Sequence, residues 1–120
     1  MKVLIIDDDA DIRFVAAMSL RAGGAIDVVE ASGGLDGVCK AREEQPDVIL
    51  LDMMMPTMDG SQTIAALRMQ TETATTPVIF LTAKTIVAEI QGMKDLGAAG
   101  VLIKPFDPRT LAADVLALLT

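Results

Sequence analysis

Acidic residues follow two of the apolar runs in this sequence, and they are the residues best suited to chemistry. Asp7 and Asp8 come directly after the first run, Val3–Ile6. Asp52 comes directly after the third run, Val48–Leu51. Two carboxylates about 4 Å apart repel each other by roughly 4 kcal/mol at an effective dielectric constant near 20, so three of them favour a divalent cation. A hard ion such as Mg²⁺ binds carboxylate and carbonyl oxygens, and a carboxylate can also attack a phosphoryl group to form an aspartyl-phosphate.

Two further polar residues end the fourth and fifth apolar runs, and they suit the same chemistry. These residues are Thr82 and Lys104. Phosphoryl transfer needs neutralisation of the equatorial oxygens and an in-line geometry rather than an elaborate base. A metal ion, the Lys104 ammonium and the Thr82 hydroxyl could supply that neutralisation. Asp52 is the expected nucleophile, and Asp8, with Asp7 behind it, is the expected metal ligand.

Five short apolar runs alternate with longer segments whose apolar residues recur at helical spacing. Three of the runs are continuously apolar, which is typical of strands covered on both faces. Strict alternation of five strands with five helices predicts one α/β domain over residues 1–120, with a doubly wound five-stranded parallel sheet. The predicted strands are Val3–Ile6, Val28–Val29, Val48–Leu51, Val78–Leu81 and Val101–Ile103.

Each predicted helix has an apolar face, and punctuating residues mark the helix ends. The residues expected on these faces are Ile12, Val15, Ala16 and Ser19; Leu35, Val38 and Cys39; Ile64 and Leu67; Ile86, Ile90 and Met93; and Leu111, Val115 and Leu118. Gly23–Gly24, Gly97 and Gly100 fit helix C-terminal stops. Asp107 followed by Pro108 predicts the start of the last helix. The caps expected for the first and third helices are Asp9, Asp11 and Asp59.

The predicted doubly wound sheet indicates where the polar residues meet, because ligands bind such sheets beyond the carboxyl ends of the strands. In the common flavodoxin-like order 2-1-3-4-5, Asp52 is central, between the acidic pair and Thr82. Neighbouring strands are about 4.8 Å apart, so Lys104 starts roughly 10 Å from Asp52 at the backbone. Its long side chain can lean back toward Asp52.

Composition excludes several other classes of function. The chain has 120 residues, 52% of them hydrophobic, and a net charge of −7, which argues against nucleic-acid binding by this domain. It has no histidine, which excludes Ser-His and Cys-His catalysis, histidine-ligated zinc and a phosphohistidine of its own. The lone Cys39 is expected to be a small buried hydrophobe. No apolar run approaches the roughly 18 residues of a membrane span, and the first run is too short for a signal peptide, so no membrane partner and a cytoplasmic location are expected.

Four stretches, in order, resemble the receiver domain of two-component response regulators. They are Val3–Asp9, Asp47–Gly60, Pro77–Ala83 and Gly97–Phe106. Each brings a polar residue to a predicted strand end, and the resemblance covers essentially the whole chain. It implies a phosphorylation-dependent signalling switch of a phosphorelay, which catalyses only its own phosphorylation and dephosphorylation.

The resemblance implies roles for the acidic residues. Asp52 would accept a phosphoryl group from a phosphohistidine on a histidine kinase or a histidine phosphotransfer domain. Asp7 and Asp8 would hold Mg²⁺ (or Mn²⁺), with Asp52 and the backbone carbonyl of Met54 completing the protein ligands.

The resemblance also implies a switch around Lys104. Lys104 would pair with the phosphoryl oxygens, and Thr82 would move to hydrogen-bond them. The Lys104–Pro105 peptide bond is expected to be cis. Receiver domains commonly have Tyr or Phe where this chain has Val101, which cannot swing a ring. A phosphorylation-independent interaction module therefore stays open as an alternative.

The remaining expectations concern the border of the site and one surface. Met54, Ala83, Lys84 and Pro105 should border the pocket, and Met54 is hypothesised to exclude water and lengthen the life of the phosphorylated state. The last helix has few charges, and Leu116 falls outside its core-facing stripe. The fourth helix, fifth strand and fifth helix are therefore expected to form an apolar surface for a second copy or a downstream protein.

Other readings of the acidic residues fit less well. Aspartyl-phosphate hydrolases of the haloacid dehalogenase group carry Asp-x-Asp-x-Thr on the first strand, whereas here Asp11 stands where Thr belongs. A calcium loop starting at Asp7 fails because Ile12 and Met18 stand where Gly and Glu are needed. A nucleotide- or flavin-binding protein would need a glycine-rich phosphate loop, which is missing.

Overall fold

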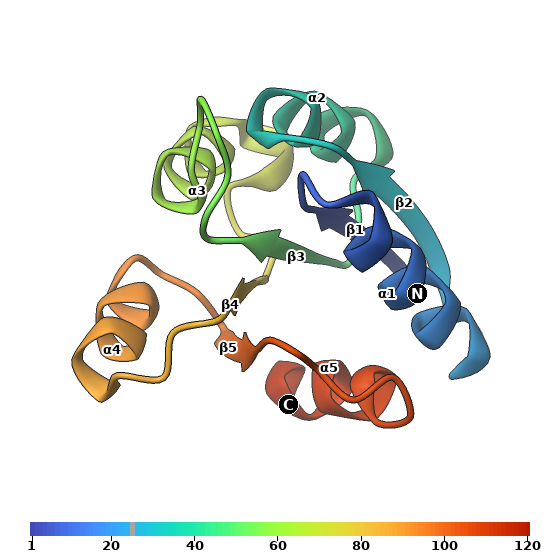
Figure 1. Cartoon of the computed structure of the whole chain (residues 1–120). Helices are drawn as coiled ribbons and strands as arrows, with labels where there is room; N and C mark the ends of the chain where they lie inside the picture. Colours follow the sequence, from blue (N-terminus) through green and yellow to red (C-terminus); the bar gives the residue numbers. More distant parts are fainter. Residues whose placement is uncertain (25) are drawn as a thin grey trace.

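A parallel sheet lies between two layers of helices (Figure 1). The computed structural model describes residues 1–24 and 26–120. The five strands lie in the order β2-β1-β3-β4-β5, all parallel, which confirms the predicted topology. The strands are β1 (Lys2–Ile6), β2 (Asp27–Ala31), β3 (Val48–Asp52), β4 (Val78–Thr82) and β5 (Gly100–Ile103).

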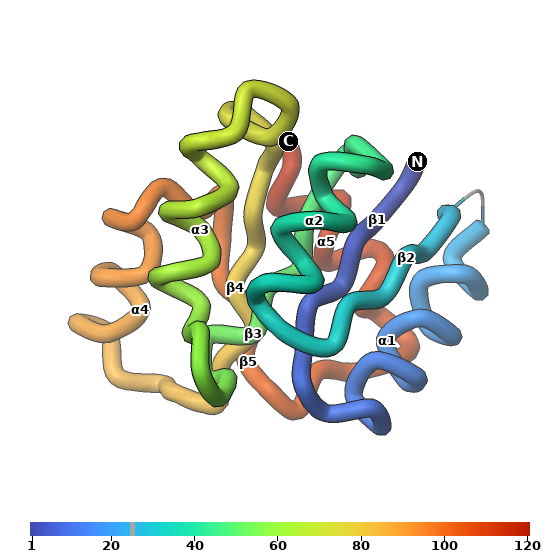
Figure 2. Tube along the Cα trace, turned by 90° about the horizontal axis from the view of Figure 1, so that it is seen from above, coloured from blue at the N-terminus to red at the C-terminus, as the bar shows by residue number. Residues whose placement is uncertain are grey.

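The helices divide between the two faces of the sheet. They are α1 (Ala10–Ala22), α2 (Gly34–Glu44), α3 (Gly60–Met69), α4 (Val87–Asp95) and α5 (Leu111–Leu119), with a short 3-10 helix at Thr71–Thr73. The helices α1 and α5 cover one face, and α2, α3 and α4 lie on the other (Figures 1 and 2). This division follows from right-handed crossovers that wind in opposite directions from β1.

Strand residues alternate between two hydrophobic cores. Leu4 and Ile6 belong to the core beneath α2, α3 and α4, whereas Val3 and Ile5 belong to the core beneath α1 and α5. The whole of β3 and β4 is buried. Both faces of the central strands are covered, which explains why their sequences are continuously apolar rather than alternating.

Side-chain caps hold two of the turns that lead from strands into helices. The Asp9 carboxylate accepts hydrogen bonds from the backbone N–H groups of Asp11 (2.9 Å) and Ile12 (3.4 Å) at the start of α1. Asp59 and Gln62 form a capping box at the start of α3. These contacts confirm the predicted caps at Asp9 and Asp59, and they fix the backbone directly beyond β1 and β3.

Two predicted boundaries are wrong. The helix α5 begins at Leu111 rather than after Asp107, because the Asp107 carboxylate instead binds the backbone and side chain of Arg109 and caps a separate turn. Gly100 begins β5 and does not end a helix. A Cβ at Gly100 would lie 2.7 Å from the Leu118 side chain, so close packing of α5 explains this glycine.

The predicted inward face of α2 is confirmed for Val38 and wrong for Leu35 and Cys39. Leu35 is 72% exposed and Cys39 is exposed, so Cys39 is not the buried residue that its type suggested. The residues of α2 that pack inward are Gly34, Gly37, Val38 and Ala41. Small residues let α2 approach the sheet closely, and a hydropathy pattern gives them little weight. Ile86, likewise expected in the core, is the exposed N-cap of α4.

None of the helices in the described part of the chain combines the length and the apolar character that a membrane-spanning helix needs.

Candidate functional site

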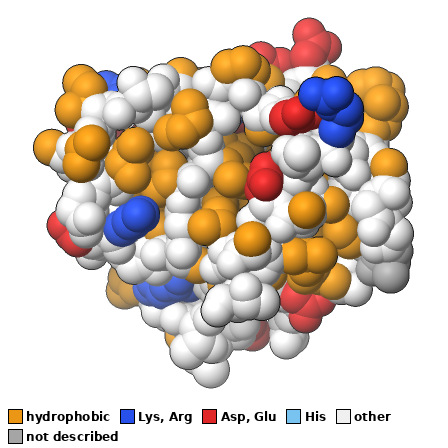
Figure 3. All heavy atoms as spheres, turned by 90° about the horizontal axis from the view of Figure 1, so that it is seen from below, with side chains coloured by type: hydrophobic (Ala, Val, Ile, Leu, Met, Phe, Trp, Pro, Cys, Tyr) orange, Lys and Arg blue, Asp and Glu red, His pale blue; other side chains and the backbone are white. Residues whose placement is uncertain are grey.

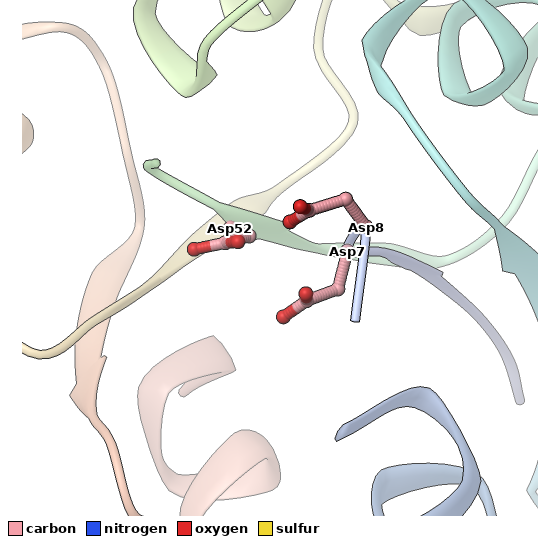
Figure 4. A group of neighbouring side chains, drawn as sticks. All are labelled: Asp7, Asp8 and Asp52. Carbon is pink, nitrogen blue, oxygen red and sulfur yellow. The ribbon is translucent and has the colours of Figure 1, made fainter. Parts of the chain in front are cut away.

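Three carboxylates meet at the carboxyl edge of the sheet. Asp7 and Asp8 follow β1, and Asp52 ends β3, the next strand in the sheet. In Figure 4 the three side chains point toward a common space. One carboxylate oxygen from each residue lies within 4.8 Å of the others. The structure therefore brings together the three carboxylates that the sequence assigned to one site.

Asp52 is one of the two buried carboxylates of the cluster. Asp52 is only 5% exposed, and its Oδ1 accepts a hydrogen bond from the backbone N–H of Met54 (3.3 Å). Burial, followed by the negative charge of Asp7, raises the pKa of Asp52 to about 6, although Lys104 and the Met54 N–H oppose the shift. Asp52 is thus a carboxylate whose ionised form depends on a nearby positive charge.

Lys104 bridges the two buried carboxylates. Its Nζ lies 2.8 Å from Asp7 Oδ2 and 3.2 Å from Asp52 Oδ1. Burial alone would lower the pKa of Lys104, but the hydrogen bond and charge of Asp7, and then those of Asp52, outweigh burial and raise it. The Lys104–Pro105 peptide bond is cis, as the resemblance implied. The long side chain of Lys104 therefore spans the intervening β4, as predicted.

Thr82 lies at the end of β4, between the strands that carry Asp52 and Lys104. Its side chain is buried, and its Oγ1 accepts a hydrogen bond from the backbone N–H of Lys84 (3.1 Å). Its carbonyl accepts a hydrogen bond from the Lys104 N–H (2.7 Å). Movement of Thr82 toward a group held at Asp52 stays a prediction; the hydroxyl that accepts the Lys84 N–H still has its own hydrogen to donate.

Of the four residues expected to border the site, two line a groove beside it, Met54 and Lys84. Met54 is 65% exposed and lines a shallow groove between the β3–α3 loop and α4. Ala83 and Pro105 are exposed, and Lys84 and Glu89, which both line the groove, form an ion pair (3.4 Å). The groove is lined by Met53, Met54, Lys84, Glu89, Gly92, Met93 and Leu96.

Val101 is half-buried against the core beneath α2, α3 and α4. It lies opposite Phe80 in the β4–β5 register. The side chain at this place is therefore aliphatic and packed, and no ring moves between buried and exposed positions.

The donor set fits a hard divalent cation. Asp7, Asp8 and Asp52 supply oxygen ligands of the kind that Mg²⁺ prefers, and Lys104 offsets only part of their charge. The Met54 carbonyl remains a predicted further ligand. When bound, such an ion supplies positive charge that favours the ionised carboxylates and would offset the charge of a phosphoryl group.

The structure also reveals a contact that sequence analysis missed. Arg13, on α1, donates a hydrogen bond from Nη1 to the backbone carbonyl of Asp7 (2.7 Å). Its Nε lies 3.5 Å from Glu30 Oε1 at the end of β2. Helical spacing gave no sign of this role, because Arg13 falls beside the predicted apolar face.

Comparison with known proteins gives one consistent answer. The response regulator receiver domain family model matches residues 3–116. The chain is 43% identical to the DNA-binding dual master transcriptional regulator RpaA of Synechocystis, over 98% of this chain and 48% of that protein. It is 36% identical to Protein PilH of Pseudomonas aeruginosa, over 98% of this chain and 97% of that protein. The structure of the chemotaxis response regulator CheY4 of Vibrio cholerae superposes with a TM-score of 0.90, at 37% identity, over 98% of this chain and 97% of that one.

A flavodoxin-like α/β domain with an acidic pocket at the carboxyl edge of its sheet is the class that the fold and site define. Within that class, the chain belongs to the response regulator receiver domain family of two-component systems. The chain spans about half the length of the curated transcriptional regulators that it matches.

Proposed function

We propose that Asp52 accepts a phosphoryl group from a phosphohistidine of a partner protein, in a reaction that depends on Mg²⁺ or Mn²⁺. The observation that carries this proposal is the bridge from Lys104 Nζ to Asp7 and Asp52, beside the third carboxylate of Asp8. This bridge places a fixed cation next to a buried carboxylate. The same arrangement supports binding of a dianionic group, because Lys104 can pair with its oxygens.

The transfer requires the ionised form of Asp52. A carboxylate oxygen of Asp52 forms a bond to phosphorus as the phosphorus–nitrogen bond of the phosphohistidine breaks, and the imidazole leaves. With a pKa of about 6, most of Asp52 is ionised near pH 7.5. Lys104 stays protonated because its pKa is raised, so it can neutralise the transferred group. The protein acts on itself and turns over no separate substrate.

The proposed partners follow from this chemistry. The donor is a histidine kinase or a histidine phosphotransfer domain, since the chain has no histidine of its own. The proposed output surface is made of α4, β5 and α5, for a second copy or a downstream protein. Figure 3, seen from below Figure 1, shows hydrophobic side chains interspersed with polar and charged ones on the side of the molecule that carries α5. Leu116 of α5 is 46% exposed. The proposed location is the cytoplasm, where kinases of this class act on their receivers.

Intact-protein mass after incubation with acetyl phosphate tests the phosphorylation chemistry directly. We expect a gain of one phosphoryl group that requires Mg²⁺ and is lost in Asp52→Asn. Asp59→Asn is a matched control, because Asp59 also follows β3 but caps α3 instead of facing the pocket. A folded protein that binds Mg²⁺ but gains no mass from acetyl phosphate, or from a phosphorylated histidine phosphotransfer domain, would contradict the proposal. It would favour an interaction module that works without phosphorylation.

A further inference from the structure

We propose that Arg13 is a positioning residue for the metal-binding aspartates, acting through the peptide that joins Asp7 to Asp8. This inference rests on the proposed function of the acidic pocket. Arg13 lies on α1, and its side chain is 18% exposed. Its Nη1 donates a hydrogen bond to the carbonyl of Asp7 at 2.7 Å.

The Asp7 side chain is held by contacts that do not involve Arg13. Its Oδ1 accepts the backbone N–H of Asp9 (2.9 Å), and its Oδ2 accepts Lys104 Nζ (2.8 Å). Its own N–H donates to the carbonyl of Ala31 on β2 (3.1 Å). What Arg13 adds is a fixed direction for the Asp7 carbonyl, and hence for the plane of the peptide that leads into Asp8.

Asp8 depends on that peptide more than its two neighbours do. Among the described residues, the Asp8 carboxylate makes no hydrogen bond or ion pair, and it is exposed. Its position beside Asp7 and Asp52 therefore comes from the backbone, which is fixed by Arg13 before it and by the Asp9 cap after it. A ligand without side-chain support gains most from a rigid backbone, since less conformational freedom is lost on binding.

Glu30 holds the guanidinium in place from the edge of the sheet. Its Oε1 lies 3.5 Å from Arg13 Nε, and its backbone carbonyl accepts Lys40 Nζ (2.6 Å). The turn after β1 is thereby tied through Arg13 to the end of β2. Glu30 also offsets the positive charge that Arg13 brings close to a cation site.

The positive charge of Arg13 makes its two possible roles distinguishable by the direction in which Mg²⁺ affinity changes. A guanidinium near the pocket repels a divalent cation, so its removal would strengthen Mg²⁺ binding if charge were its main effect. If Arg13 positions the Asp7–Asp8 peptide, its removal weakens Mg²⁺ binding. The two roles predict opposite changes in the dissociation constant.

Titration of the whole chain with Mg²⁺ by isothermal calorimetry, without phosphate donor, tests the inference. We expect Arg13→Ala to raise the dissociation constant about tenfold, the lower end of the usual range for residues that orient metal ligands. Arg13→Lys should recover part of the affinity, because it can still donate to the Asp7 carbonyl. Glu30→Gln should weaken binding less than Arg13→Ala does.

Arg21→Ala is the matched control. Arg21 lies on the same helix and also donates to a backbone carbonyl, that of Val28 (3.4 Å), away from the three aspartates. The Mg²⁺ dissociation constant of Arg21→Ala should stay within twofold of that of the parent, because substitutions at distant sites usually act independently. If Arg13→Ala does not fold, Arg13→Lys carries the test with the same expected direction, because it keeps the positive charge and changes only the hydrogen-bond geometry.

Unchanged or tighter Mg²⁺ binding in folded Arg13→Ala would overturn the inference, and so would equal weakening in Arg21→Ala. These results are separable from failure of the proposed function. If the parent chain binds Mg²⁺ but is not phosphorylated, the proposed function fails. The Mg²⁺ titration of the Arg13 variants still tests the positioning role. If the parent is phosphorylated and Arg13→Ala binds Mg²⁺ normally, only the positioning role is wrong.

Discussion

At the scale of single residues, the site places two buried carboxylates on either side of one lysine. Asp7 and Asp52 are both nearly inaccessible, and Lys104 Nζ lies within 3.2 Å of each. Burial disfavours the ionised form of Asp52, and the neighbouring charge of Asp7 adds to that effect. The ionised site that phosphoryl transfer needs therefore reduces the stability of the folded protein.

This conflict predicts how stability depends on pH. The pKa of Asp52 is about 6 in the folded protein and 3.8 as the ordinary value, so the folded state binds this proton more tightly. The stabilisation is fully present below about pH 4 and is lost as the pH rises through 6. Asp52→Asn should therefore raise the free energy of unfolding by about 1–3 kcal/mol at pH 7.5, and by much less at pH 4.5.

Urea unfolding followed by circular dichroism checks this prediction, since the chain has no Trp or Tyr for fluorescence. The measurement is made without divalent cations. Asp27→Asn, at an exposed position at the start of β2, is the control and should show no such gain. Equal stability of Asp52→Asn and the parent at pH 7.5 would show that Lys104 fully compensates the buried charges.

Met54 carries a prediction about the lifetime of the phosphorylated state. Its side chain is apolar and lies in the groove beside the pocket, where a polar residue would order water. Met54→Asn should speed loss of the phosphoryl group by about threefold or more, because water reaches the site more readily. The decay of the phosphorylated mass after removal of the donor measures this rate. Met69→Asn, at the exposed far end of α3, should decay like the parent, and an unchanged rate in Met54→Asn would remove the hypothesis.

The site residues were predictable because strand ends are visible in the sequence. Asp52, Thr82 and Lys104 each follow an apolar run directly, and parallel pairing brings those ends to one edge. Arg13 was not predictable in this way. Its contact is with a backbone carbonyl, which leaves no complementary residue type in the sequence to pair with it.

At the scale of secondary structure elements, two glycines inside helices have contrasting surroundings. Gly37 of α2 faces the sheet, and a Cβ there would overlap the Ile6 side chain. Gly92 of α4 faces the groove, and a Cβ there would meet nothing within 4 Å. The first glycine is needed for packing, whereas nothing in the fold requires the second.

These surroundings predict opposite effects of the same substitution. Gly92→Ala should increase the free energy of unfolding by about 0.5–1 kcal/mol, because alanine favours a helix interior. Gly37→Ala should decrease it by about 1–3 kcal/mol, because the added methyl forces α2 away from the buried β1. Urea unfolding of the two variants side by side checks both signs. A loss of stability in Gly92→Ala would show that α4 packs more tightly than the structure indicates.

The same small residues explain where the prediction of elements was wrong. Strands and their order were predictable from continuous apolar runs in strict alternation with helices. The rotation of α2 about its axis was not, since Gly34, Gly37 and Ala41 face inward while Leu35 remains in solvent. A hydropathy pattern selects the largest apolar residues, but close helix–sheet packing can select the smallest.

At the scale of the whole molecule, the two faces of the sheet offer a way to test the proposed output surface. Leu116 on α5 and Leu35 on α2 are both exposed leucines on helices, and they lie on opposite layers. If the α4, β5 and α5 surface mediates association, Leu116→Glu should weaken self-association of the phosphorylated chain at least about tenfold, as expected for a buried interface residue. Sedimentation velocity with acetyl phosphate and Mg²⁺ measures this.

Leu35→Glu is the control and should associate like the parent. Leu116→Glu that leaves both self-association and binding of a downstream protein intact would remove the proposed surface. The charge of −7 on each copy opposes dimer formation at low salt, so the measurement belongs at physiological ionic strength.

Both ends of the chain lie at the edge of the sheet opposite the aspartates. In Figure 2 the N- and C-termini are at the top, whereas the turns that follow the strands are at the bottom, because β1 starts and α5 finishes at the amino edge. A biotin, a sensor surface or a dye attached at either end would therefore sit about a strand length, roughly 17 Å, from the pocket. The molecule can therefore be tethered by either terminus with its acidic pocket facing outward, so real-time binding of a kinase can be recorded with either attachment.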